Sequence, residues 1–577
     1  MLKLARYLKK FKLYVIIGPA FKLIEAIFEL IVPLVIKRII DVGIGTGDTN
    51  YVLKMGGVLV LLGIVGLCST LVCQRSAAIA SQGVGTLIRD DMFRHIGTLS
   101  HEQLDRIGTP SLITRITSDI NQLQVAVAML IRLVIRAPFL AIGAIIMAMS
   151  IDLTISLIFL VSTVLIFLVI FLIMSKSVPF FKSIQKKLDR ISLITRENLS
   201  GARVIRAFSG ENRERTRFKD AADDYTDSAI AVSKLSALLN PLTLVIINLA
   251  IAAIILLSGK PVNEGDLTQG DVIALVNYMN QTLQALIVVA NLFVIFTKAA
   301  ASAARVNEVL DCKASIVDAL NAAYPSHPAA VRMRFDNVCF RYPDSEENAL
   351  DNISFEVKKG ETVGIIGATG SGKSTIISLI PRFFDVTSGS IEFDGVDIRD
   401  LPVKELRAHI GLVPQKSMLI SGTIADNLRF GAPDATDDEL WRAAEIAQAA
   451  EFIRSKPDGM SAPVTQGAKN LSGGQRQRLT IARALASNPE LLILDDSASA
   501  LDFATDAKLR AALGELSRTT ELTQIIVSQR VSSIRHADKI LVIDDGTLIG
   551  TGTHDTLKRD CGVYLEICRS QLREEEL

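Results

Sequence analysis

The sequence has little net charge and few cysteines for its length. Its 577 residues include 62 lysines and arginines and 61 aspartates and glutamates, which gives a formal net charge of +1. That balance excludes a polybasic nucleic-acid binder and an acidic disordered tail. The cysteines lack the spacing of a disulfide scaffold or a zinc site, so we expect them to be reduced. They are Cys68, Cys73, Cys312, Cys339, Cys561 and Cys568.

Apolar residues, by contrast, are abundant. They make up 49% of the chain, only 21% of the residues are charged, and the mean hydropathy is +0.36. A single hydrophobic core stops growing near roughly 250 to 300 residues, so a chain of this length is expected to form two or more units. The apolar excess is too large for an average soluble enzyme, and it is concentrated before about Leu320.

This N-terminal part contains six segments that are long enough to cross a membrane. About 20 helical residues span the roughly 30 Å of the hydrocarbon core. Four segments have uncharged stretches of this length, whereas the first carries Lys22, Glu25 and Glu29 and the third carries Arg132 and Arg136. The predicted spans are residues 13–36, 55–74, 123–149, 153–175, 235–259 and 272–297.

The loops between the spans indicate their orientation. The first span is too long and too charged to be a cleaved secretory signal, so we expect it to remain in the mature protein. The short loops 41–50, 150–152 and 260–270 carry mainly acids, whereas the long loops 75–122 and 176–234 are rich in Lys and Arg. Basic residues favour the cytoplasmic side. We therefore expect a multi-pass protein of the cell (inner) membrane with both termini and both long loops in the cytoplasm. The long loops are expected to continue the spans as helices.

From about Val331 the sequence has the pattern of a soluble α/β domain. Strand-like runs at 362–366, 491–494 and 539–543 alternate with helical patterns, which predicts a mainly parallel sheet covered by helices. A linker with two prolines, residues 321–330, separates this domain from the spans.

A phosphate-binding motif lies near the start of this domain. Between an apolar strand and a helical pattern, the sequence matches G-x-x-x-x-G-K-[ST] with the residues Gly367, Ala368, Thr369, Gly370, Ser371, Gly372, Lys373 and Ser374. The backbone N–H groups of such a loop cradle phosphates, Lys373 contacts the β- and γ-phosphates, and the Ser374 hydroxyl binds Mg²⁺. Asp495 follows the strand 491–494 and supplies a carboxylate to the same ion. We therefore expect ATP and Mg²⁺ as ligands.

Shortly before that strand the chain contains a pentapeptide that other phosphate-loop proteins lack, formed by Leu471, Ser472, Gly473, Gly474 and Gln475. It matches the signature of the ATP-binding-cassette family, which the sequence resembles along practically its whole length. Gln415 looks like the family's Q-loop residue, and Tyr342 lies where the family stacks adenine on an aromatic ring. The family's D-loop motif is similar to the run formed by Ser499, Ala500, Leu501 and Asp502. Residues 108–119 and 201–211 resemble the two coupling helices of its exporters.

The resemblance implies an exporter half-transporter. Its parts would be an all-α, six-helix transmembrane domain (1–320), the linker 321–330, and an α/β phosphate-loop ATPase domain (331–577). Two such chains pair, and each ATP lies between the phosphate loop of one chain and the signature of the other. The implied Mg²⁺ ligands are Ser374, Gln415 and Asp495. The implied ATP-binding residues are Tyr342, Gly367, Thr369, Gly370, Ser371, Gly372, Lys373, Ser374, Thr375, Gln415 and Asp495.

Two catalytic positions depart from the family's pattern. Active members have a glutamate that polarises the attacking water, whereas this chain has Asp496, which is one methylene shorter. A displacement near 1 Å can cost about a hundredfold in rate. The family's switch histidine is replaced by Gln529, which cannot carry the charge of an imidazolium. We therefore predict a degenerate site that binds ATP but hydrolyses it poorly, in a heterodimer whose partner carries the glutamate and the histidine.

The exported substrate is expected to be amphipathic: a drug-like molecule, a lipid or a peptide. Two alternatives remain open. The chain could form a homodimeric exporter in which Asp496 works after a small backbone shift. It could also be a regulatory, nucleotide-sensing membrane subunit that gates a partner without transporting anything itself.

Polar residues within the spans are candidates for the substrate path. Lys22, Glu25 and Glu29 share one helix face, and Arg132 and Arg136 share another. Because charges inside a membrane are costly, these five either line a cavity or form buried structural pairs. The sixth span has a polar stripe that we expect to line the translocation cavity, the alternative being inter-helix hydrogen bonds of about 0.6 kcal/mol each. It consists of Asn277, Asn280, Gln281 and Gln284.

Overall fold

The structure is a computed structural model, and it describes residues 2–319, 330–343, 345–497 and 500–572. The chain divides into two compact units. The first comprises Met1–Gly97 and Thr109–Cys312, and the second comprises Thr98–Gly108 and Lys313–Leu577. All of the predicted linker 321–330 except Ala330 lies outside the described residues.

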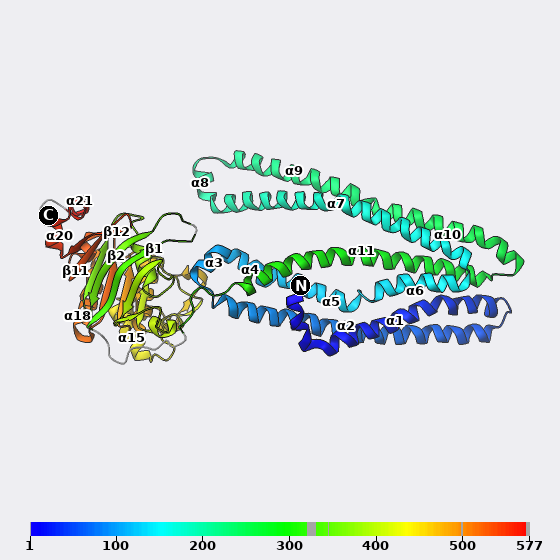
Figure 1. The fold of residues 1–577 in the computed structure, drawn as a ribbon, viewed down its shortest axis with the longest axis horizontal. Helices are drawn as coiled ribbons and strands as arrows, with labels where there is room; N and C mark the ends of the chain where they lie inside the picture. Colours follow the sequence, from blue (N-terminus) through cyan, green and yellow to red (C-terminus); the bar gives the residue numbers. More distant parts are fainter. Residues whose placement is uncertain (1, 320–329, 344, 498–499, 573–577) are drawn as a thin grey trace. The chain divides into compact units, whose positions relative to one another are not determined.

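The first unit consists of helices (Figure 1). In chain order they are η1 (Leu2–Phe11), α1 (Lys12–Arg38), η2 (Ile39–Ile44), α2 (Thr49–Ile96), α4 (Thr109–Thr114), η3 (Arg115–Asp119), α5 (Ile120–Arg132), α6 (Arg136–Ile151), α7 (Leu153–Ser200), α8 (Ala202–Ala207), α9 (Glu211–Ala237), α10 (Leu239–Glu264) and α11 (Gln269–Asp311). The expectation that helices continue far into the long loops is confirmed, because α2 and α7 are each 48 residues long.

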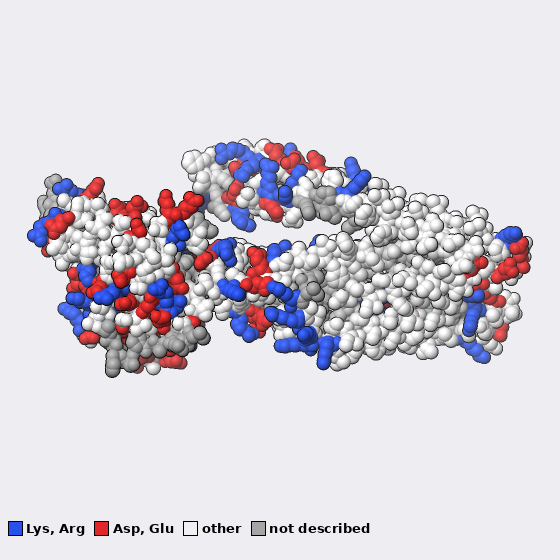
Figure 2. All heavy atoms as spheres, viewed as in Figure 1, with Lys and Arg blue, Asp and Glu red and all other residues white. Residues whose placement is uncertain are grey.

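Five helical stretches among the described residues are long and apolar enough to cross a membrane: Thr49–Ile96, Thr109–Ile151, Leu153–Ser177, Glu211–Glu264 and Gln269–Asp311. They contain the second to the sixth predicted spans. The first predicted span also forms a helix, the 27-residue α1, but its charged residues keep it out of these five. On the face drawn in Figure 2, the charged side chains of this unit gather toward its ends and leave a largely uncharged region between them.

Helices of this unit share one apolar core. It contains Ala26 of α1, Ala144 of α6, Phe159 of α7, Ile254 of α10 and Ala274 of α11, all of which are fully buried. Small side chains allow helix backbones to approach closely, which is the main source of packing energy between helices in a membrane.

Polar residues of the short loops start several of the long helices. The side chains of Asp48 and Asp152 each accept a hydrogen bond from a backbone N–H in the first turn of α2 and α7. Thr268 and Asp271 form a capping box at the start of α11. These side chains satisfy N–H groups that have no partner inside the helix. Asp48 and Asp152 are among the acids from which we expect the short loops to lie on the outer side of the membrane. These two residues are therefore also helix caps.

The second unit is the α/β unit. Its elements are α3 (His101–Ile107), β1 (Val331–Phe340), β2 (Leu350–Lys358), β3 (Thr362–Ile366), α12 (Lys373–Leu379), β4 (Ser388–Phe393), β5 (Val396–Asp397), α13 (Val403–Ala408), β6 (Ile410–Val413), β7 (Gly422–Thr423), α14 (Ile424–Arg429), α15 (Asp437–Ile446), α16 (Ala450–Arg454), η4 (Gly459–Ser461), β8 (Pro463–Val464), η5 (Gln466–Ala468), α17 (Gly473–Ala486), β9 (Leu491–Asp495), α18 (Phe503–Thr520), β10 (Thr523–Val527), α19 (Val531–Ile534), β11 (Lys539–Asp544), β12 (Thr547–Gly552), α20 (His554–Asp560) and α21 (Gly562–Gln571).

The predicted, mainly parallel sheet is confirmed. Six strands lie in the order β12-β11-β3-β10-β9-β6, and only β12 is antiparallel to its neighbour. A second, antiparallel sheet has the order β2-β1-β4-β5. Because β3 and β9 flank β10 in parallel, their carboxyl ends meet at one edge of the sheet. Ligands of open α/β sheets bind at this edge.

A short helix from the first long loop belongs to the second unit. Within that unit the His101 ring of α3 packs against Phe383, with 4.3 Å between the ring centroids and 32° between the ring planes. Ser315 donates a hydrogen bond of 2.8 Å to Ser100, just before α3. The compact α/β unit thus contains residues 98–108 and resumes at Lys313, and the domain boundary at 331 stays a prediction. The predicted coupling segment 108–119 forms α4 and η3 of the first unit, and 201–211 contains α8. Their coupling role stays a prediction.

Candidate functional site

The phosphate loop connects β3 to α12 in a conformation that requires glycine. Gly370 and Gly372 have φ angles of +87° and +99°, a region that side chains with a Cβ rarely adopt. A Cβ on Gly367 would lie 2.0 Å from the carbonyl oxygen of Ile543. Thr369 is exposed on the same loop. The loop is therefore held close against the neighbouring strand β11, and its turn precedes α12 directly.

Lys373, the first residue of α12, points back into this loop. Its Nζ donates hydrogen bonds to the carbonyl oxygens of Gly367 at 3.0 Å and Ala368 at 2.5 Å. Burial lowers the pKa of Lys373, while the nearby charges of Asp495 and Asp496 oppose that change. The ammonium group therefore lies where the carboxyl end of β9 meets the loop.

The other loop residues differ in exposure. Ser374 is exposed, whereas Ser371 and Thr375 are buried. The Lys373 Nζ lies 3.2 Å from the Ser371 hydroxyl, and the Thr375 hydroxyl lies 3.1 Å from that of Tyr342. The Ser374 hydroxyl is thus accessible to a ligand at the mouth of the loop, and Tyr342 is brought next to α12.

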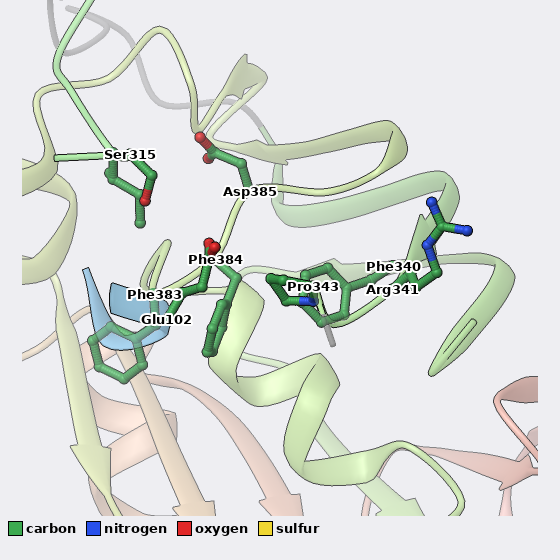
Figure 3. A pocket seen from close by; sticks show the side chains of 9 residues that line it. Glu102, Ser315, Phe340, Arg341, Pro343, Phe383, Phe384 and Asp385 are labelled. Atoms are coloured by element: carbon green, nitrogen blue, oxygen red, sulfur yellow. The ribbon is translucent and has the colours of Figure 1, made fainter. Parts of the chain in front are cut away.

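Tyr342 belongs to an aromatic group beside the loop. Its ring packs edge-on against Phe340 and Phe384, with centroids 4.8 Å and 5.6 Å apart. The cavity in Figure 3 is lined by Phe340 and Phe384, by Phe383, and by Glu102 of α3. Its volume is about 150 Å³. The predicted adenine-stacking residue therefore lies at the border of a hollow in the second unit.

Two neighbouring carboxylates end β9. Burial raises the pKa of Asp495, and the charge of Asp496 raises it further, whereas the backbone N–H of Gln415 and the Lys373 charge act in the opposite direction. The side-chain Nε2 of Gln415 donates to Oδ2 of Asp496 over 3.4 Å. The structure thus places Lys373, Gln415 and both carboxylates in one region, and their roles toward ATP and Mg²⁺ stay predictions.

These groups fit a magnesium ion. A buried carboxyl whose pKa is raised by a neighbouring carboxylate is stabilised by a cation. Mg²⁺ prefers oxygen ligands, and in nucleotide sites one or two carboxylates hold it together with substrate phosphates. Asp495, the Ser374 hydroxyl and the side-chain oxygen of Gln415 are such donors. Among the described residues no group of three or more His, Cys, Asp or Glu side chains could hold a metal.

Asp496 has an unusual backbone conformation. Its φ angle is +44°, and its N–H donates a hydrogen bond of 2.9 Å to the carbonyl oxygen of Val527 in β10. A non-glycine residue in this region is strained by roughly 1 kcal/mol or more. The main chain that carries the shortened carboxylate is thus tied to the neighbouring strand.

Gln529 follows β10 in an exposed loop. Its carbonyl oxygen accepts a hydrogen bond of 2.7 Å from the Nε2 of Gln571, and the Oε1 of Gln571 accepts one of 2.9 Å from the N–H of Val531. The last residue of α21 therefore holds the main chain on both sides of Arg530. Sequence reasoning missed this contact, because no motif links a glutamine near the C-terminus to this loop.

The signature residues start α17. Ser472 caps the helix and forms a capping box with Gln475, whose N–H donates to the Ser472 hydroxyl at 3.2 Å. Leu471 is buried, Gly473 is exposed, and a Cβ on Gly474 would lie 3.2 Å from the carbonyl oxygen of Ala500. The signature therefore lies against the predicted D-loop.

The described part of the D-loop prepares the next helix. Leu501 is buried, and the Asp502 side chain accepts a hydrogen bond of 3.0 Å from the N–H of Thr505 at the start of α18. Ser499 lies outside the described residues. Among those that are described, no hydrogen bond joins the signature to the phosphate loop. The two motifs are thus separate sites of the α/β unit.

Comparisons with known proteins agree with this arrangement. Residues 15–286 match the family described as "ABC transporter transmembrane region", and residues 350–499 match "ABC transporter". An ABC transporter ATP-binding protein of Mycobacterium tuberculosis is 37% identical over 575 residues, which cover 98% of this chain and 97% of that protein.

Two further relatives have more informative descriptions. An ATP-dependent lipid A-core flippase of Chromobacterium violaceum is 31% identical over 96% of this chain and 94% of its own length. A solved structure of a bacterial Atm1-family ABC exporter with ATP bound is 26% identical, covers 99% of both chains and has a TM-score of 0.80. The chain belongs to the ATP-binding-cassette exporters, as a half-transporter in which a transmembrane region is fused to an ATPase domain.

Proposed function

We propose that this chain is one subunit of a heterodimeric exporter, in which its own phosphate loop binds ATP with Mg²⁺ but hydrolyses it slowly. Its signature, Leu471 to Gln475, completes the ATP site of the partner chain. The observation that carries this proposal is the difference between the intact phosphate loop and the altered catalytic positions Asp496 and Gln529.

The groups that bind nucleotide are all present. Lys373 supplies positive charge to the β- and γ-phosphates, and the loop presents backbone N–H groups at the start of α12. Ser374, Gln415 and Asp495 hold Mg²⁺, which neutralises charge on the phosphate oxygens. Tyr342 provides an aromatic ring for adenine. These residues support tight binding, whatever the rate of hydrolysis.

The groups that would activate the attacking water, Asp496 and Gln529, are less suited to their task than the groups that bind the nucleotide. The 3.4 Å distance between Gln415 Nε2 and Asp496 Oδ2 is longer than the usual 2.7 to roughly 3.2 Å of a hydrogen bond. A backbone shift that advanced the carboxylate would have to break the bond from Asp496 to Val527 and alter a strained φ angle. The short side chain thus has little freedom to compensate for the missing methylene. The neutral Gln529 lacks the charge that an imidazolium would place near the γ-phosphate.

An intact signature beside a weak catalytic site suits a heterodimer. The exposed N-terminus of α17, capped by Ser472, directs its positive end outward. In a pair of cassettes it would face the partner's γ-phosphate. ATP then favours the closed pair because it contacts both chains there, and only such differential binding can drive the membrane unit between two states. The subunit would lie in the cell membrane with its ATPase domain and both termini in the cytoplasm, and it would export an amphipathic substrate.

The test is ATP hydrolysis by the purified full-length chain, alone and with its partner. Alone, the wild-type protein is expected to hydrolyse ATP about a hundredfold more slowly than the double variant Asp496→Glu, Gln529→His. Binding of ATP is expected to be unchanged. Asp545→Glu is a matched control, because Asp545 is an exposed aspartate whose φ angle of +42° resembles that of Asp496 and to which the proposal gives no role. Fast hydrolysis by the wild-type homodimer that survives Asp496→Asn would contradict the proposal.

A further inference from the structure

A mixed charge cluster lies within the first unit, remote in sequence from the ATP site. It consists of Lys22, Glu25 and Glu29 on α1 and of Arg132 and Arg136, which flank the break between α5 and α6. The sequence left open whether these five residues line a cavity or pair structurally. The contacts of these residues distinguish the two alternatives.

Both carboxylates of the charge cluster have partners. Lys22 Nζ donates to the two oxygens of Glu25 at 2.8 and 2.6 Å, and the Thr70 hydroxyl on α2 donates to Glu25 at 2.5 Å. Arg136 Nη2 donates to Oε2 of Glu29 at 2.7 Å. Structural pairing is thus real, but it uses only two of the three cations.

The third cation, Arg132, has no such partner among the described residues. Arg132 is the last residue of α5, and only residues 133–135 separate it from Arg136 at the start of α6. The Nε atoms of Arg132 and Arg136 are buried and have no hydrogen-bond partner among the described residues. The Arg136 Nε is 4.0 Å from Glu25, beyond hydrogen-bond reach. A guanidinium buried with an unsatisfied donor is costly, and an anion would relieve this cost.

One side of the charge cluster is open. The Glu29 side chain is 38% exposed and that of Arg136 is 21% exposed, whereas Lys22 is nearly buried. Ionised side chains in a membrane face a protein interior or a water-filled cavity, not lipid. Gln281 of the polar stripe on α11 donates a hydrogen bond of 3.1 Å to the backbone carbonyl of Glu29. This inter-helix hydrogen bond connects the charge cluster to the stripe that we expect to line the substrate path.

The backbone supports this location. The third predicted span is interrupted at residues 133–135, between the two arginines. Irregular backbone at membrane depth is tolerated only inside protein or beside a water-filled cavity. The break thus separates Arg132, the last residue of α5, from Arg136, the first residue of α6 and the partner of Glu29.

We propose that the charge cluster binds the anionic headgroup, a phosphate or a carboxylate, of an amphiphilic substrate. Arg132 and Arg136 donate to the headgroup, and Glu29 competes with it for Arg136. Planar guanidinium groups bind such oxyanions through paired hydrogen bonds. This inference rests on the proposed export function and specifies its substrate class.

The test is binding of fluorescent dodecyl phosphate to the full exporter, with its partner chain, in nanodiscs. Arg132→Gln is expected to weaken binding about tenfold, and Arg132→Lys less, because the lysine retains the charge but not the paired donors. Glu29→Gln is expected to tighten binding several-fold. Arg75→Gln on the exposed surface of α2 is the control and should change nothing. An unchanged thermal unfolding transition, together with unchanged ATP binding, shows that each variant is folded.

Three comparisons identify the ligand. Zwitterionic dodecylphosphocholine should bind about tenfold more weakly than dodecyl phosphate. Competition by inorganic phosphate alone would assign the site to a free anion instead of an amphiphile, and loss of binding only in nanodiscs of anionic lipid would assign it to bulk lipid headgroups. Either result overturns the proposal, as does equal binding by wild type and Arg132→Gln. If a neutral amphiphile is still exported with ATP in that case, the proposed function stands while the substrate class is wrong.

Discussion

Gln571 and Gln529 are joined by a hydrogen bond of 2.7 Å from the side chain of the first to the carbonyl oxygen of the second. Together with the bond from Val531 to Gln571, it fixes the loop in which the family has its switch histidine. The helix α21 thus holds the main chain at Gln529, which the sequence predicts to be a catalytic position, from 42 residues away in sequence.

Replacing Gln571 with alanine should therefore loosen this loop. Two hydrogen bonds are lost, and we expect the free energy of unfolding of the ATPase domain to fall by about 1 to 2 kcal/mol. In a Gln529→His background the same change should also slow ATP hydrolysis, because the histidine is no longer held in place. Denaturant unfolding and steady-state hydrolysis measure the two effects. Ser570→Ala on the same helix is the control, and an equal loss in both variants would contradict a specific role for Gln571.

A second prediction concerns the phosphate loop. Gly367→Ala would place a Cβ 2.0 Å from a backbone oxygen of β11, so the loop must move or the strands must separate. We expect loss of ATP binding and a fall in thermal stability. Gly514→Ala is the matched control, because a Cβ on this residue of α18 meets no atom within 4 Å, and it should stabilise the helix by about 0.5 to 1 kcal/mol. Normal nucleotide affinity of Gly367→Ala would show that the close approach is unimportant.

Much of this site follows from local sequence, for a physical reason. A parallel sheet brings the carboxyl ends of its strands to one edge, so a glycine-rich loop after one apolar strand and an aspartate after another must meet there. Lys373 and Asp495 are therefore predictable as neighbours. The bond between Gln571 and Gln529 is not, because each is a polar residue in no periodic pattern and only the tertiary fold brings them together.

The helix α3 can be predicted from the sequence only in part. Residues 75–122 are expected to continue the spans as helices, and α2 does so as far as Ile96. The chain then turns, restarts at the capping residue Ser100 and stops at Gly108, where φ is +78°. These glycine and cap signals are present in the sequence. What they could not reveal is that the resulting helix packs against Phe383 in the α/β unit, since that contact depends on residues almost 300 positions away.

The two adjacent carboxylates lead to a third prediction, on pH. Burial and Asp496 raise the pKa of Asp495 in the folded protein, so its protonated form is favoured there. Its contribution to stability is present below the unfolded pKa and is lost as pH rises through the folded one. Asp495→Asn should therefore raise the melting temperature of the nucleotide-free protein at neutral pH, and this gain should shrink as the pH falls.

The same variant should lose the additional stabilisation that Mg²⁺ gives in the presence of ATP, because a metal ligand is removed. Thermal unfolding at several pH values, with and without Mg-ATP, separates these effects. Asp400→Asn, an exposed residue of the same domain, is the control. A melting temperature that falls at neutral pH without nucleotide would mean that Asp495 stabilises the apo fold, contrary to the argument from its environment.

The last prediction concerns α3. The ring of Phe383 lies between His101, at 4.3 Å between centroids, and the Arg407 guanidinium, at 5.2 Å from the ring centre. Burial and the Arg407 charge lower the pKa of His101, so its neutral form packs here at physiological pH. Phe383→Ala removes the surface on which α3 rests. The helix α3 belongs to the ATPase unit although it comes from the first long loop between the predicted spans. We therefore expect that Phe383→Ala lowers the transport per ATP hydrolysed while ATP binding is retained. Phe430→Ala, which removes an exposed ring of the same domain, should leave that ratio intact. If both variants transport normally for each ATP consumed, then α3 contributes packing to the ATPase unit but does not carry the signal between ATP and substrate.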